Sequence, residues 1–201
     1  MYILGHIGLG YIAFKLINRN KDYDVSIALL YSLLPDIDIL LPYIEHRGPT
    51  HSLLFPTFIL IIYLILDPSK FSYSIPIYTH IFADIIAQPI TYGYMKLLWP
   101  INNKIYQINP IVIMRTNQEA YLEIFIFIIS AILFIKSDYK QFINRSKSYV
   151  LLLIIIPLTI SSLLYKLIGI NLILNIFQIC LDVFLIYIFI KKTKLYNMFF
   201  S

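Results

Sequence analysis

Seven apolar segments alternate with short polar stretches along the chain, and each of them predicts a helix. They cover residues 2–18, 25–43, 52–66, 73–99, 119–135, 149–165 and 168–190. Pro35 interrupts the second segment, and Pro89 with Gly93 predicts a kink or a break in the fourth. Thr50 or Ser52 can cap the third helix, because hydroxyl oxygens accept hydrogen bonds from the first free amides. Several segments are shorter than the ~20 residues of a comfortable membrane span, so some helices are expected to be half-inserted or buried in the bundle.

The composition indicates that these apolar segments belong to a membrane protein. Of the 201 residues, 59% are hydrophobic and 13% are charged, about half the charged fraction of a soluble domain. We therefore predict an all-α fold, a polytopic membrane helical bundle with about five to seven membrane-embedded segments. Linkers and repeats are absent from the sequence, so residues 1–201 form one domain, with additional apolar helices within 149–190. The single Cys180 lies in an apolar run and is expected to be a small core residue.

The basic residues give a membrane orientation. If the N-terminus is outside and all seven segments cross, eleven of the 16 Lys and Arg residues face the inside and five face the outside. This bias is typical of cytoplasmic loops, and it explains the net charge of +5 without a nucleic-acid partner. We predict a multi-pass protein of the inner or plasma membrane, with membrane lipids as its surroundings and the polar residues of 36–51 toward the outer half.

One stretch of this apolar chain contains several ionisable side chains close together. The stretch LLPDIDILLPYIEHRGPTHSLL holds Asp36, Asp38, His46, Arg47 and His51 within about twenty residues. A turn after the proline lets both carboxylates face one point, which a regular helix would not allow. Carboxylate oxygens with imidazole nitrogens are ligands of zinc, manganese or iron, and an arginine suits an anionic substrate. The alternative is a polar loop between helices whose side chains are merely solvated.

Four further candidate ligands fall inside apolar segments. His80 and Asp84 are four residues apart and therefore lie on one face of a helix. Ionisable groups are costly in such segments and usually face a partner or a cavity. His6 and Glu123 are candidates for the same reason. The alternatives are a helix-interface histidine at position 6, a surface pair at 80 and 84, and a glutamate that reaches the membrane boundary at 123.

Several motifs carry a family resemblance over residues 4–135. GHIGLGYIAFK, LLPDID, HRGPTHSLL, THIFAD with YGYMKLLWP, and NQEAYLEIF follow one another in this order. In this respect the chain resembles the LexA-binding, inner-membrane-associated metal-dependent hydrolase family, which is more remotely similar to the all-helical zinc-dependent phospholipases C. The resemblance implies that residues 1–135 carry the site and that its metal ligands are His6, Asp36, Asp38, His46, His51, His80, Asp84 and Glu123.

The leading hypothesis is a membrane-bound metal-dependent hydrolase acting on a phosphoester or a lipid-linked substrate. It would hold two or three divalent ions, with zinc favoured and manganese or iron as alternatives. Arg47 would bind a phosphate oxygen, and Asp38 or Glu123 would act as the general base. Two rivals stay open: a metal-binding transporter lined by the same residues, and a non-catalytic membrane regulator that binds a protein partner.

Overall fold

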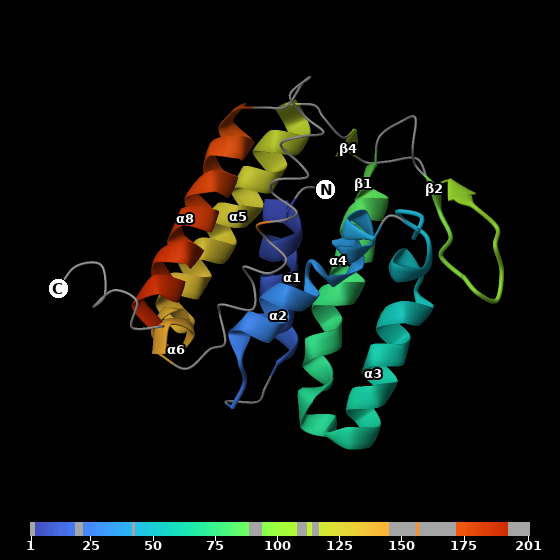
Figure 1. Cartoon of the computed structure of the whole chain (residues 1–201), viewed down its shortest axis with the longest axis horizontal. Helices are drawn as coiled ribbons and strands as arrows, with labels where there is room; N and C mark the ends of the chain where they lie inside the picture. Colours follow the sequence, from blue (N-terminus) through green and yellow to red (C-terminus); the bar gives the residue numbers. More distant parts are fainter. Residues whose placement is uncertain are drawn as a thin grey trace.

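Helix α1 (Ile3–Ile17) lies at the centre of the molecule, between α5 (Asn117–Ser137) on one side and α4 (Ile75–Ile86) on the other (Figure 1). The structure, a computed structural model, describes residues 3–18, 22–41, 43–88, 94–107, 112–113, 117–144, 156 and 172–192. Two glycines let α1 approach its neighbours closely. A Cβ atom on Gly8 would lie 2.8 Å from Cγ2 of Ile126, and one on Gly10 would lie 2.5 Å from Cβ of Ser32. Larger residues at these positions would push α1 away from its packing partners.

The remaining elements surround α1 in two groups (Figure 1). Helix α8 (Leu172–Lys192) runs beside α5, and the short α6 (Tyr139–Asn144) follows α5 directly. On the other side, α3 (Leu54–Leu66) and η3 (Pro68–Ser74) lead into α4. Helix α2 (Val25–Tyr31) contacts both groups, whereas η1 (Leu34–Leu40) and η2 (Pro49–His51) lie on the side of α3 and α4. Parallel pairing joins β1 (Ala87–Gln88) to β4 (Val112–Ile113), and antiparallel pairing joins β2 (Tyr94–Met95) to β3 (Tyr106–Gln107).

Two carboxylates of the α5–α6 segment hold α1 at two levels. Near its start, the backbone N–H of Gly5 donates a hydrogen bond to the buried Glu123 over 3.2 Å. Further along, the hydroxyl of Tyr11 donates to the buried Asp138 over 2.6 Å, and Lys15 pairs with the same carboxylate at 3.2 Å. These polar contacts fix the position of α1 along α5, and thereby the position of His6 relative to α5.

The mostly helical architecture confirms the helical class predicted from the apolar segments, with two pairs of two-residue strands added. Helix α2 ends at Tyr31 and η1 takes over around Pro35, so the predicted interruption is confirmed. The fourth segment is helical only to Ile86, and Pro89 and Gly93 lie outside the described residues. Apart from residue 156, the predicted segment 149–165 also lies outside them.

Two local predictions are wrong. Helix α3 begins after Leu53 without a side-chain cap, because the hydroxyl of Thr50 donates to Asp38 and that of Ser52 donates to the carbonyl of Pro49. Cys180 is exposed and not part of the core; it lines an apolar cavity of about 320 Å³ between α1, α5, α6 and α8. An apolar run can hold an exposed cysteine because most of the surface of α8 is itself apolar.

Within the described residues, one stretch is long and apolar enough to cross a membrane. It is Ala120–Ser137 in α5, with a mean hydropathy of 2.0. The apolar helices α1 and α3 have 15 and 13 residues, which at 1.5 Å per residue reach only about 20–22 Å of the ~30 Å hydrocarbon core. The predicted five to seven membrane-embedded segments therefore stay a prediction.

Candidate metal centre

Three donor atoms form a nearly equilateral triangle at the centre of the site. Nε2 of His51 lies 3.3 Å from Nε2 of His80, and Oδ1 of Asp36 lies 3.5 Å from the first and 3.4 Å from the second. All three side chains are buried. A regular tetrahedron with zinc–ligand bonds of about 2.0–2.1 Å has edges of about 3.3–3.4 Å. The triangle therefore has the size of one face of a zinc coordination tetrahedron.

The orientation of His80 is set by a backbone carbonyl. Its Nδ1 lies 2.7 Å from the carbonyl oxygen of Ser32, which can only accept, so Nδ1 carries the proton and donates. The lone pair is then on Nε2, which faces the triangle, and this is the tautomer required of a metal ligand. Gly10 allows α1 to approach the same Ser32, so the close packing of α1 and the orientation of His80 are linked.

Asp38 plays the corresponding role for His51. Its Oδ2 lies 3.2 Å from Nδ1 of His51 and accepts hydrogen bonds from the hydroxyl of Thr50 at 2.7 Å and the amide of Arg47 at 3.2 Å. Its Oδ1 lies 2.9 Å from Nδ1 of His46. With both oxygens engaged, Asp38 is better placed to orient the histidines than to bind a metal or act as a base, the two roles expected from the sequence.

Burial and hydrogen bonds have opposite effects on the carboxylates of this site. Burial raises the pKa of Asp38, but hydrogen bonds from His46 and His51 outweigh it and hold that pKa well below its usual range. Burial also raises the pKa of Asp36, but His80 and His51 beside it keep that pKa well below normal. Both carboxylates are therefore ionised at neutral pH, as metal binding and its support require.

A second position adjoins the triangle. Asp84 places Oδ2 3.5 Å from Nε2 of His51, and its Oδ1 lies 3.2 Å from Nε2 of His6. The ring of His6 stacks on that of His80 with centroids 3.6 Å apart. One donor atom from each of His6, His80 and Asp84 falls within 4.8 Å of the others. The two oxygens of Asp84 thus lie beside two different imidazoles, so Asp84 would be able to contact ions at both positions.

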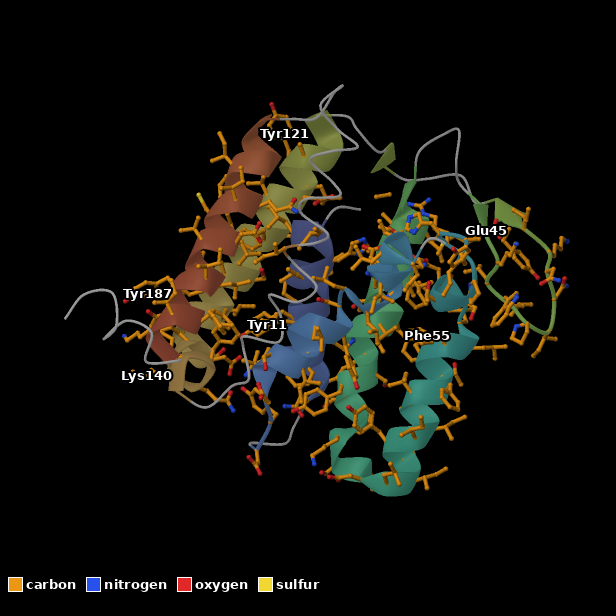
Figure 2. The ribbon with its side chains drawn as sticks, viewed as in Figure 1. Tyr11, Glu45, Phe55, Tyr121, Lys140 and Tyr187 are labelled. Carbon is orange, nitrogen blue, oxygen red and sulfur yellow. The ribbon has the colours of Figure 1, made fainter. Side chains whose placement is uncertain are left out.

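Arg47 lies directly beside this carboxylate. Its Nη2 is 3.6 Å from Oδ2 of Asp84, and its side chain is buried. Its backbone has a φ of 66°, which is uncommon for a residue other than glycine. Glu45, the other carboxylate near this arginine in sequence, pairs instead with Lys96 at 2.5 Å beside the β2–β3 hairpin (Figure 2). The structure thus places the guanidinium against Asp84, next to the donor atoms.

The two remaining predicted residues lie at the edges of the site. His46 is the exposed member, with 43% of its side chain accessible, and its nearest donor atom lies within 4.8 Å of donors from Asp36 and His51. Glu123 is buried and holds the backbone of Gly5, the residue before His6. Seven of the eight predicted ligands are therefore linked by contacts in one region formed by α1, η1, η2, the loop between η1 and η2, and α4, and Glu123 reaches it through Gly5.

The region that carries this site matches a known family. The family model of the YdjM inner membrane protein covers residues 1–170 of the chain. The chain belongs to the YdjM inner membrane protein family. No curated protein and no solved structure matches it. All the donor residues of this YdjM protein lie within the matched region, and its family places it in the inner membrane. Hydrolase activity and LexA binding, which the sequence resemblance implied, stay predictions.

Two supporting residues of this YdjM protein were missed from the sequence. Ser32 acts through its backbone carbonyl, which leaves no side-chain signal. The sequence suggests Thr50 only as a helix cap, although its hydroxyl donates to Asp38 and lies 3.1 Å from Nδ1 of His51. Its position directly before a candidate ligand was the one available hint.

His51 binds a proton unusually tightly in the metal-free protein. Burial lowers its pKa, but hydrogen bonds to Asp36 and Asp38 raise it more, to about 9. At neutral pH this imidazole is therefore protonated until a metal takes the proton's place, because only the neutral ring can be a ligand.

Proposed function

We propose that this protein is a membrane-bound metal-dependent hydrolase of phosphoesters, with zinc as the favoured ion. The observation that carries the proposal is the triangle of Asp36, His51 and His80, whose edges of 3.3–3.5 Å fit one zinc ion. Two histidines with a carboxylate are a ligand set of catalytic zinc sites, whereas the common structural sites use cysteines alone or with histidines. Two imidazoles and one carboxylate are also a donor set that manganese or iron accepts.

The neighbouring position supports a centre of two ions. Asp84 presents one oxygen to each position, and His6 provides a nitrogen on the far side. When bound, paired ions would lower the pKa of a bound water toward neutrality and polarise a phosphoryl oxygen. A third ion, also within the prediction from the sequence, would have to use His46 at the exposed edge.

The chain's own residues would orient the substrate and move the proton. Arg47 can donate two N–H groups to phosphate oxygens, and it lies close enough to Asp84 to face a group bound there. Of the two carboxylates predicted as general base, Asp38 is engaged by four donors, and Glu123, which accepts from the amide of Gly5, is the remaining candidate. Asp38 and Ser32 hold the two imidazoles and exclude their wrong tautomers.

We also propose a multi-pass arrangement with the site toward the outer half of the membrane. It rests on the inner-membrane family, the candidate span in α5 and the eleven-to-five distribution of basic residues. Cysteines placed at Ile44 and Tyr139, in a Cys180→Ala background, should react with an impermeant reagent from opposite sides. Both wild-type side chains are exposed, so access is not limited by packing. Labelling from one side only would contradict the arrangement.

The rival functions find less support. A transporter path would need polar groups continuing along the helices, whereas half of the candidate ligands lie on η1, η2 and the loop between them. Asp138, a buried carboxylate further along α1, accepts a hydrogen bond from Tyr11 and forms an ion pair with Lys15. A regulator that binds a protein partner would not require the tetrahedral spacing of the triangle.

Metal analysis of the detergent-purified protein tests the proposal. We expect at least one zinc per chain by mass spectrometry, lost in Asp36→Asn and His80→Ala, together with hydrolysis of bis(p-nitrophenyl) phosphate that chelators abolish. Asp67→Asn is the matched control, because Asp67 is an exposed carboxylate with the same kind of hydrogen bonds outside the site. Wild-type metal content in both site variants would refute the metal centre, and bound zinc without any hydrolysis would refute the enzyme.

A further inference from the structure

Two adjacent loops expose a cluster of large apolar side chains beside the exposed edge of the site. The loop that carries His46 also exposes Tyr43, with 98% of its surface accessible, and Ile44. The β2–β3 hairpin exposes Ile101, with 79% accessible, together with Leu98 and Trp99. We call these five side chains the apolar rim: Tyr43, Ile44, Leu98, Trp99 and Ile101.

The two parts of the rim are held together by backbone and side-chain contacts. The amide of Lys96 donates to the carbonyl of Arg47 at 3.4 Å, and the amide of Leu53 donates to the carbonyl of Leu97 at 2.8 Å. The Lys96–Glu45 ion pair lies between the two loops, and Figure 2 shows Glu45 next to the hairpin. The rim is therefore held on one part of the folded protein, next to the loop that carries His46.

The composition of the rim fits the headgroup layer of a membrane. Aromatic side chains and lysines gather at this depth, since an amphipathic ring or a long basic side chain satisfies both the apolar and the polar side. Here Tyr43 and Trp99 accompany aliphatic residues, with Lys96 and Lys104 on the same hairpin. In a protein of the inner membrane, the headgroup layer can cover apolar side chains whose exposure to water would be unfavourable.

We propose that the apolar rim lies in the headgroup layer of the bilayer and places the mouth of the site at that depth. The group recognised is then a phosphoester that is itself anchored in the membrane, and it reaches Arg47 past His46. The position of the rim is independent of catalysis, whereas the class of substrate rests on the proposed hydrolase function.

Trp99 provides a direct test, because it is the only tryptophan of the chain. The full-length protein is reconstituted in vesicles of phosphatidylethanolamine and phosphatidylglycerol containing lipids brominated either near the headgroup or near the chain end. We expect stronger quenching of Trp99 by the shallow bromines than by the deep ones, and partial protection from iodide. Full access to iodide without quenching by either lipid would place the rim in water.

Two other outcomes also contradict the proposal. Stronger quenching by the deep bromines would place the hairpin within the hydrocarbon core. Protection from iodide and from both brominated lipids would mean that a protein partner or a second copy of the chain covers the rim.

A kinetic experiment then tests the substrate class. Ile101→Ser should lower the rate on a phosphoester embedded in vesicles at least several-fold, while zinc content and the rate on soluble bis(p-nitrophenyl) phosphate stay unchanged. Leu66→Ser is the matched control, because Leu66 is 77% exposed but lies at the far end of α3, about 20 Å along the helix from η2. Equal rates for the two variants on the embedded substrate would overturn the substrate class. Failure to hydrolyse either substrate would count against the hydrolase, and the fluorescence result would still decide the position of the rim.

Discussion

Replacing Asp38 by asparagine separates an orienting role from the roles of ligand and base. The substitution keeps the shape of the side chain but removes its charge and turns one acceptor oxygen into a donor. The bond from Nδ1 of His51 to Asp38, at 3.2 Å, would be lost or become neutral, and the amide of Arg47 and the hydroxyl of Thr50 would compete for the remaining oxygen.

The size of the effect follows from these contacts. A hydrogen bond to a charged group contributes about 1.5–3 kcal/mol, and each 1.4 kcal/mol changes a binding constant tenfold. Asp38→Asn should therefore weaken zinc binding by about 10–100-fold, the range known for partners that orient a metal-bound histidine. The metal-free protein should also lose about 1–3 kcal/mol of stability, since at least one buried donor loses its acceptor.

Competition with a chromophoric chelator measures the zinc affinity, and thermal unfolding with and without zinc measures the stability. Asp67→Asn again serves as the control, because it makes the same chemical change at an exposed carboxylate bonded to Ser69 and Lys70. Complete loss of zinc from Asp38→Asn would make Asp38 a ligand. Unchanged affinity with a reduced rate would make it the general base. Either result would refute the orienting role.

The limits of α3 and α5 could be predicted well from their apolar runs, whereas the fourth apolar segment is helical only to Ile86. Helix α3 stops at Leu66, directly before Asp67 and Pro68, and α5 extends only two residues beyond the predicted segment at each end. The β2–β3 pair could not be predicted in the same way. Its strands have two residues each, which is too short for the alternation that identifies a strand.

The members of the site could be recognised from the sequence, but not their individual roles. Asp36, His51 and His80 stand out because ionisable residues are rare in such a chain. Which imidazole nitrogen faces the metal depends on Ser32 and Asp38, two partners that only the folded backbone brings to the rings. The role of each donor is thus a property of the tertiary packing, whereas its presence is a property of the sequence.

Three further predictions address the packing, the protonation and the chemistry of the site. Gly10→Ala should lower the free energy of unfolding by about 1–3 kcal/mol and weaken zinc binding, because the new Cβ would press on Ser32; equal melting temperatures would contradict this. Because the pKa of His51 rises from 6.5 to about 9 on folding, its contribution to the stability of the metal-free protein is complete below pH 6.5 and is lost as the pH rises through 9. A melting temperature of the chelator-treated protein that stays constant or increases over this range would contradict that prediction. Arg47→Lys should keep the zinc content and the melting temperature but lower kcat/KM for a phosphodiester by about 10–1000-fold, because a single ammonium cannot replace the forked donors at the developing charge. The 3.6 Å contact with Asp84 also permits a purely structural arginine. In that case Arg47→Lys would be nearly silent, whereas Arg47→Ala would lower the melting temperature and the zinc affinity together, so the three measurements on both variants decide between the two roles.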